Sequence, residues 1–71
     1  MSLLDAREGK RYQIRSIDLQ DDALTAFLFS LGCYSQEPIT VVKHRRNGCT
    51  VSIKNGRYHM DRHLAKAILI G

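Results

Sequence analysis

The fold of this chain follows from three consecutive segments, which read Ile39-Thr40-Val41-Val42-Lys43-His44, Arg45-Arg46-Asn47-Gly48 and Cys49-Thr50-Val51-Ser52-Ile53-Lys54. The first segment is rich in β-branched residues and the last alternates apolar and polar residues, so both are predicted to be strands. The Asn47-Gly48 pair between them tolerates the positive φ angles of a tight hairpin turn. Asn55-Gly56 repeats this signal before Arg57-Tyr58-His59-Met60, which predicts three strands in a meander.

Upstream of the meander, the segment from Lys10 to Ile17 has the pattern of another strand. Tyr12 and Ile14 alternate with long polar residues, as a half-buried strand requires. Ile17 falls out of phase with them, and we expect a bulge or bend close to it.

The segment from Asp21 to Leu31 has the period of a helix instead. Leu24, Phe27, Leu28 and Leu31 follow i, i+3, i+4 and i+7 spacing and are predicted to form one buried stripe. Asp21 and Asp22 suit the N-terminal end of a helix, and Gly32 suits the left-handed residue that ends one.

The end of the chain predicts a short turn and a last strand. Asp61 is placed to cap a helical turn through Arg62–Ala65, and Ala67–Ile70 has the β-branched spacing of a strand. The expected fold class is mainly β: a small five-stranded Src-homology-3-like β-barrel with one amphipathic α-helix between strands 1 and 2 and a short helical turn before the last strand. The helix is expected to cover an open end or edge of the barrel.

Length and composition predict a single domain over residues 1–71, because a chain this short cannot divide its apolar residues between two cores. With 44% hydrophobic and 25% charged residues, the composition is that of a globular protein. No apolar stretch approaches the ~20 residues that span a bilayer, and no basic start precedes an apolar segment. We therefore expect a cytoplasmic protein without membrane insertion, whose Cys33 and Cys49 are reduced thiols.

Residue patterns for catalysis are missing from the sequence. The glycines do not fall into phosphate-loop spacing, and neither Cys33 nor Cys49 lies in a known nucleophile motif. The sequence therefore predicts no enzyme, no catalytic residues and no cofactor.

Transition-metal ligand types do occur, at His44, His59, His63, Cys33, Cys49 and Asp61. His59 and His63 are four residues apart but straddle a predicted strand and turn, so they are not expected to share a helix face. We interpret these groups as solvated or core residues and assign no metal ligand. A metal-binding protein that uses His59, His63 and a cysteine is kept as an alternative.

Basic residues exceed acidic ones by 11 to 7, and Lys43, Arg45, Arg46, Lys54 and Arg57 gather at the two predicted hairpins. Such positive charge favours binding to acidic proteins, anionic lipids or nucleic acid. Only 7% of the residues are aromatic, and Tyr12, Phe27 and Tyr58 are predicted to lie in the core instead of forming a base-stacking surface. No nucleic-acid partner is expected, and a small basic nucleic-acid-binding barrel is the other alternative.

Phe29 lies well off the predicted buried stripe, so it is expected to be exposed. Together with the nearby Tyr34 it is predicted to anchor a partner protein, although a second buried helix face would explain Phe29 equally well.

Four fragments of the chain, in order, resemble the FeoA family, the small cytoplasmic proteins of the bacterial ferrous iron uptake system. Leu4 and Gly9 lead into Tyr12-x-Ile14-x-x-Ile17, followed by Phe27-Leu28-Phe29-Ser30-Leu31-Gly32-Cys33, Glu37-Pro38-Ile39-Thr40-Val41 and Ala65-x-x-Ile68-x-Ile70. The family often has glycine just before the position of Glu37, where this chain has Gln36, so we expect a different backbone shape in that turn.

The resemblance implies a Src-homology-3-like barrel that regulates FeoB, a membrane iron transporter whose cytoplasmic G domain hydrolyses GTP. It implies no catalytic residues. We accordingly predict an accessory protein of iron transport that contacts FeoB through five residues and whose weak self-association is left open. The predicted contact residues are Phe29, Tyr34, Arg45, Arg46 and Arg57.

Overall fold

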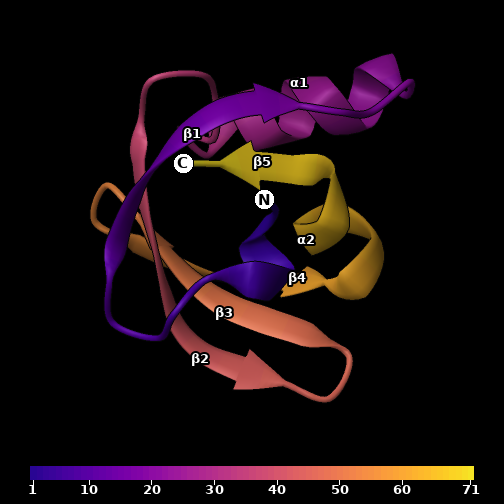
Figure 1. Ribbon diagram of the computed structural model, residues 1–71. Coiled ribbons are helices and arrows are strands. Elements are labelled where there is room, and N and C mark those ends of the chain that lie inside the picture. The colour runs from indigo at the N-terminus through magenta and orange to yellow at the C-terminus, as the bar shows by residue number, and fades with distance from the viewer.

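The computed structural model describes residues 1–71 and has five strands in one antiparallel sheet, with two α-helices (Figure 1). In chain order the elements are a 3-10 helix η1 (Leu3–Asp5), β1 (Arg11–Ile17), α1 (Asp22–Ser30), β2 (Pro38–Arg45), β3 (Gly48–Ile53), β4 (Gly56–Asp61), α2 (Arg62–Ala67) and β5 (Ile68–Ile70). The strands are ordered β4-β3-β2-β1-β5 in the sheet. The expected mainly β class and element order are confirmed.

The predicted meander of β2, β3 and β4 is also confirmed, but its turns are one residue earlier than the Asn-Gly pairs predict. The two-residue connections are Arg46-Asn47 and Lys54-Asn55, and each glycine is the first residue of the next strand. The positive φ angles belong to Gly48, at +142°, and to Lys54, at +53°. The turn prediction was therefore wrong in position, because the strand register pairs Gly48 with Arg45 and Gly56 with Ile53, which leaves the two residues between each pair in the turn.

The two edges of the sheet are β4 and β5, and no ladder joins them. The outer side of β5 is covered by the N-terminal residues: Ile70 N–H donates to the Met1 carbonyl at 2.8 Å. Helix α2 connects the two edge strands and packs against β3, β4, β5 and η1. The expected irregularity in β1 is present as a register shift between Ile14 and Ser16 along the β5 ladder.

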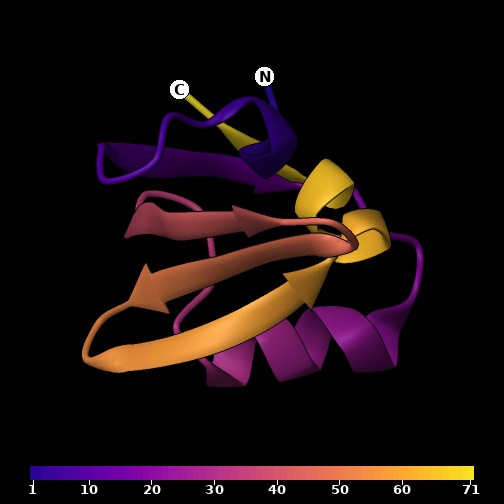
Figure 2. The ribbon, with the colours of Figure 1, turned by 90° about the horizontal axis from the view of Figure 1, so that it is seen from below.

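Helix α1 begins and ends with the predicted caps. The Asp21 carboxylate accepts a hydrogen bond from Leu24 N–H at 3.0 Å. At the other end, Gly32 has φ +92°, and the N–H groups of Gly32 and Cys33 donate to the carbonyls of Phe29 and Leu28. This is the left-handed glycine termination predicted for a helix end. Figures 1 and 2 show α1 outside the sheet.

Fourteen buried residues form the hydrophobic core, which draws on every strand as well as η1, α1 and α2. Leu28 is the only fully buried residue of α1. Leu24 and Leu31 are half-buried, whereas Phe27 is 53% exposed. The prediction that Phe27 belongs to the core was wrong, because α1 packs through a narrower face than the four-residue stripe requires.

Two further boundaries differ from the sequence-based expectation. Asp61 caps α2 through Leu64 N–H at 2.8 Å, as predicted, but the helix extends through Ala67, and β5 begins only at Ile68. The 3-10 helix was not predicted. A capping box between Ser2 and Asp5 stabilises it, and its first residue, Leu3, is fully buried. Neither α-helix is long and apolar enough to cross a membrane.

Candidate protein-binding surface

Phe29, at the C-terminal end of α1, forms an aromatic pair with the half-buried Tyr34. Their ring centres lie 4.6 Å apart at an interplanar angle of 32°. Phe29 is 63% exposed, the largest exposed fraction among the bulky hydrophobic side chains. The predicted exposure of Phe29 is confirmed, and the structure places Tyr34 against it. Aromatic pairs at this separation stabilise each other by ~0.5–1.5 kcal/mol beyond the area that they bury.

An ion pair from two turns supports this aromatic pair. Lys54, in the β3–β4 turn, donates a hydrogen bond to Glu37, which precedes β2. The Lys54 ammonium lies 5.7 Å from the centre of the Tyr34 ring, within cation–π range. The hydrogen bond lowers the pKa of the Glu37 carboxyl and raises the pKa of the Lys54 ammonium. Both groups are therefore held in their charged forms.

Gly32 allows these groups to come together. A Cβ atom at Gly32 would lie 2.7 Å from Lys54 Cε and 3.4 Å from Ile53 Cγ2. Because Gly32 also has a positive φ angle, it both ends α1 and leaves space for the aliphatic part of Lys54. We call Phe29, Tyr34, Glu37 and Lys54 the aromatic cluster.

The three predicted arginines are divided between two ends of the molecule. Arg57 is the second residue of β4, beside the β3–β4 turn that contains Lys54. Arg45 and Arg46 lie at the β2–β3 turn, at the opposite end of β3. Figure 2 shows these two turns on opposite sides, with the C-terminal end of α1 on the side of the β3–β4 turn. The structure thus brings Phe29 and Tyr34 together, places Arg57 beside the β3–β4 turn, and puts Arg45 and Arg46 at the opposite end of β3.

The candidate metal ligands do not gather. Cys33 and Cys49 are free thiols in the core, whereas His59 and His63 are exposed. Burial raises the pKa of Cys33 to about 11 and also raises the pKa of Cys49. His44 is half-buried, and its Nε2 forms a 2.6 Å hydrogen bond with the Ala6 carbonyl. No three His, Cys, Asp or Glu side chains lie close enough to share a metal ion.

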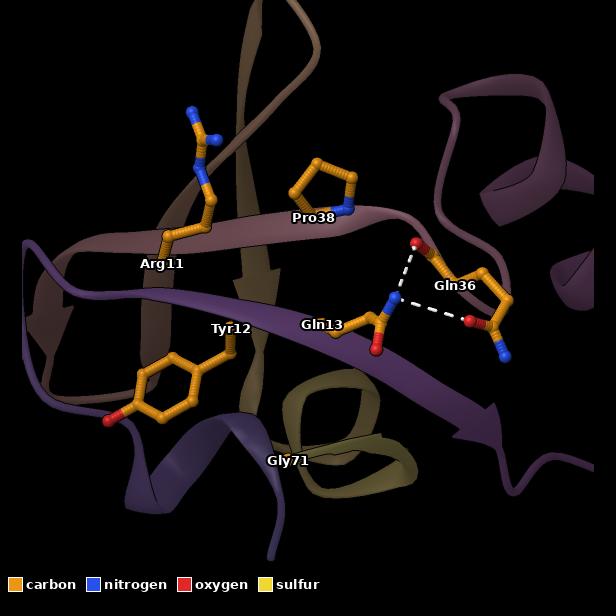
Figure 3. Close-up of a pocket in the computed structure, with 6 residues that line it drawn as sticks. All are labelled: Arg11, Tyr12, Gln13, Gln36, Pro38 and Gly71. Carbon is orange, nitrogen blue, oxygen red and sulfur yellow. Dashed lines mark hydrogen bonds between the residues drawn. The ribbon is translucent and has the colours of Figure 1, made fainter.

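A polar hollow of about 480 Å³ lies over β1 and the turn before β2 (Figure 3). Its lining consists of Arg11, Tyr12, Gln13, Gln36, Pro38 and Gly71. The Gln13 amide Nε2 donates to both the backbone carbonyl and the side-chain oxygen of Gln36, at 3.3 and 3.2 Å. These two hydrogen bonds fix one wall of the hollow.

Gln36 itself has φ +79°, the region that glycine prefers. The expectation that glutamine changes the backbone shape of this turn was therefore wrong: Gln36 adopts the glycine-like angle. Its N–H group donates to the Ile14 carbonyl at 2.8 Å, and this bond, together with those from Gln13, holds the unusual conformation.

Comparison with protein families gives a match to the FeoA domain over residues 1–71. The chain belongs to the FeoA domain family. No protein with a curated description matches it. The family resemblance of the four sequence fragments is thus confirmed over the whole chain.

Solved structures agree with this family. The solution structure of iron(II) transport protein A from Clostridium thermocellum matches with a TM-score of 0.87 at 19% identity, over 99% of this chain and 44% of that chain. A crystal structure of an iron uptake regulatory protein (FeoA) matches with a TM-score of 0.85 at 20% identity, over 99% of this chain and 93% of that chain. The solution structure of the FeoA protein from Chlorobium tepidum matches with a TM-score of 0.88 at 21% identity, over 99% of this chain and 68% of that chain. The chain thus spans less than half of the first structure, and these likenesses confirm the fold.

Within this FeoA domain, sequence reasoning missed two members of the aromatic cluster. Glu37 and Lys54 are 17 residues apart, and no local pattern indicates that they pair. The signal that was available is the position of Lys54 in a predicted turn, directly after an inward-facing residue, Ile53. It places Lys54 at the end of the sheet but not against Tyr34, because that contact depends on how α1 ends.

Proposed function

We propose that this FeoA-family protein is a non-enzymatic, cytoplasmic accessory protein of ferrous iron uptake that binds the cytoplasmic part of a FeoB-type, GTP-hydrolysing membrane transporter. The family match and the iron-transport names of the related solved structures support the role in iron uptake. The single observation that carries a protein-binding role is the exposed Phe29 side chain, which is stacked on the half-buried Tyr34.

The aromatic cluster has the properties of an interface anchor. Large aromatic side chains supply much of the binding energy at interfaces, most effectively in a few well-packed positions. Phe29 is already stacked on Tyr34, and Lys54 and Glu37 hold Tyr34 from the other elements. A partner that covers this pair therefore immobilises few additional side chains, so binding costs little side-chain conformational entropy.

The arginines contribute in two ways under this proposal. Arg57 lies beside the β3–β4 turn and is placed to contact the same partner as the aromatic cluster. Arg45 and Arg46 lie at the far turn and are proposed to act through longer-range attraction. Charges at the rim of an interface mainly change the association rate and its dependence on salt.

The test is calorimetric titration against the detergent-solubilised FeoB-type transporter from the same cell, with and without a GTP analogue. We expect saturable binding that Phe29→Ala weakens by about 2 kcal/mol, or roughly 30-fold. Phe27→Ala is the matched control, because it removes the same side chain from the same helix and Phe27 is also more than half exposed.

Equal weakening by Phe27→Ala and Phe29→Ala would remove the aromatic cluster from the proposal. An absence of binding in both nucleotide states would contradict the transporter-binding function itself. A salt-dependent gel-shift titration and a zinc or ferrous iron titration would then test the nucleic-acid and metal alternatives.

A further inference from the structure

The outer face of the sheet carries a row of donor side chains that no sequence pattern indicates. Antiparallel register places Arg57 opposite Ser52, Ser52 opposite Thr40, and Thr40 opposite Arg11. The row therefore crosses four strands, from β4 to β1, with an arginine at each end and two hydroxyl groups in the middle. Directly opposed residues have Cβ atoms ~4.5–5.5 Å apart, so neighbours in this row are close enough to bind one ligand.

The donors in this row are free of competing acceptors. The one ion pair of the molecule joins Lys54 and Glu37, which leaves the guanidinium groups of Arg11 and Arg57 without a carboxylate partner. Of the other carboxylates, Asp5, Asp21 and Asp61 cap helices, and Glu8 accepts a hydrogen bond from His44 N–H at 2.7 Å. The row thus has positive charge and unused hydroxyls, with no acidic residue in its middle.

The same surface is hollowed. A depression of about 150 Å³ is lined by Arg11, Pro38, Thr40, Ser52 and Lys54. Arg11 and Pro38 line both this depression and the larger hollow of Figure 3, so the two hollows are adjacent, and we call them together the groove. At Lys54 the groove meets the aromatic cluster, because this residue lines one and belongs to the other.

We propose that this groove binds an extended, carboxylate-bearing segment of the partner protein, which rests on the proposed function in that the same partner covers Phe29 and Tyr34. Arg11, which lines the groove, and Arg57, which lies opposite Ser52 at the end of the row, bind carboxylates of the segment. The hydroxyls of Thr40 and Ser52, which also line the groove, donate to these carboxylates. Guanidinium groups suit this role because they bind planar carboxylates through two parallel hydrogen bonds.

An acidic protein segment fits the groove better than the other anionic macromolecules do. None of the four residues of the row is aromatic, and Tyr12 and Tyr58 pack partly against the core, so the row itself offers no surface for base stacking. A lipid bilayer is flat and meets a hollowed polar surface poorly, and the exposed Phe27 and Phe29 belong to α1, not to the row. An extended chain can follow the groove along its whole length.

The first experiment is titration of the isotope-labelled protein with a synthetic hexaglutamate peptide, followed by backbone amide chemical shifts. Shifts are expected to concentrate at Arg11, Thr40, Ser52 and Lys54. The double variant Arg11→Gln/Arg57→Gln is expected to raise the dissociation constant about fivefold or more. Thr40→Val keeps the charge and shape but removes a hydroxyl, and is expected to raise it about threefold.

The matched control is Arg45→Gln/Arg46→Gln, which removes the same charge at the far turn. Equal weakening by both double variants would overturn the proposal, since it would show non-specific attraction to a cationic protein. The proposal is also overturned if inorganic phosphate, an oligonucleotide or vesicles containing phosphatidylglycerol give the same shifts at lower concentrations than hexaglutamate does.

Titration against the transporter separates this proposal from the proposed function. If Arg11→Gln and Thr40→Val bind the transporter as the unmodified protein does, while Phe29→Ala is weakened, the groove proposal fails and the function stands. If the unmodified protein does not bind the transporter, the function fails, and with it the assignment of the groove to that partner. We expect both groove variants to bind the transporter more weakly than the unmodified protein does. The affinity of Arg45→Gln/Arg46→Gln is expected to be closer to that of the unmodified protein.

Discussion

Replacement of Gly48 by alanine tests how tightly the β3–β4 ladder fixes this fold. Gly48 begins β3 with φ +142° and lies opposite Asp61. A Cβ atom there would lie 1.9 Å from the Met60 carbonyl oxygen and 2.8 Å from Asp61 Cα. Both are backbone atoms, so no side-chain rotation relieves the clash, and β4 has to move.

The magnitude follows from comparison with Gly9. Gly9 also has a positive φ angle, +82°, but nothing lies within 4 Å of the position of its Cβ atom. Gly9→Ala therefore costs only the backbone conformation, about 1–2 kcal/mol. Gly48→Ala adds the loss of ladder hydrogen bonds, about 1 kcal/mol each, and disturbs the Asp61 cap of α2, worth about 0.5–2 kcal/mol. The sum is about 3–5 kcal/mol, a large part of the ~4–10 kcal/mol expected for a domain of this size.

Thermal unfolding followed by circular dichroism measures the difference. A loss of 1 kcal/mol lowers the Tm of a domain of this size by about 4–8 °C. Gly48→Ala is therefore expected to unfold at least about 8 °C below Gly9→Ala, because it loses ~2 kcal/mol or more in addition. Two variants with Tm values within a few degrees of each other would refute the reasoning, since they would show that β4 moves aside at little cost.

Two further predictions concern buried side chains. Leu28→Ala removes the only fully buried side chain of α1 and is expected to cost about 2–5 kcal/mol in urea unfolding, with the half-buried Leu24→Ala costing less; equal losses would show that α1 is anchored along its whole length. Because burial raises the pKa of Cys33 to about 11, its thiolate population between pH 7 and 8 is about a hundredfold below that of an ordinary thiol, so reaction with a maleimide is expected to be at least that much slower than in urea-unfolded protein. Similar rates in the folded and unfolded states would contradict the burial of Cys33.

The features predicted correctly from sequence are those fixed by near neighbours in the chain. Asp21 and Asp61 cap helices because each accepts from an N–H group three residues later, and Gly32 ends α1 because only glycine takes its φ angle without strain. The exposure of Phe29 follows from its angle around the helix axis. These properties need no knowledge of the rest of the fold.

The features that were missed depend on long-range packing. The helical period places Phe27 beside Leu28, but whether the sheet reaches far enough to cover it depends on how α1 is seated. The donor row depends on strand register, which a bulge in β2 between Val41 and Lys43 shifts by one residue. Alternation alone therefore does not place Thr40, Ser52 and Arg11 in one line.

The two exposed phenylalanines of α1 differ in how strongly they are held. Phe29 is stacked on Tyr34, which Lys54 approaches from the β3–β4 turn, whereas Phe27 is exposed without an aromatic partner. An anchor that is ordered before binding loses less side-chain freedom when a partner covers it. Since the two side chains are identical, the difference in transporter affinity between Phe29→Ala and Phe27→Ala reflects this ordering together with position. Lys54 belongs to the aromatic cluster and also lines the groove, so one partner can contact both sites. Once that partner is bound at one site, its binding at the other becomes effectively intramolecular.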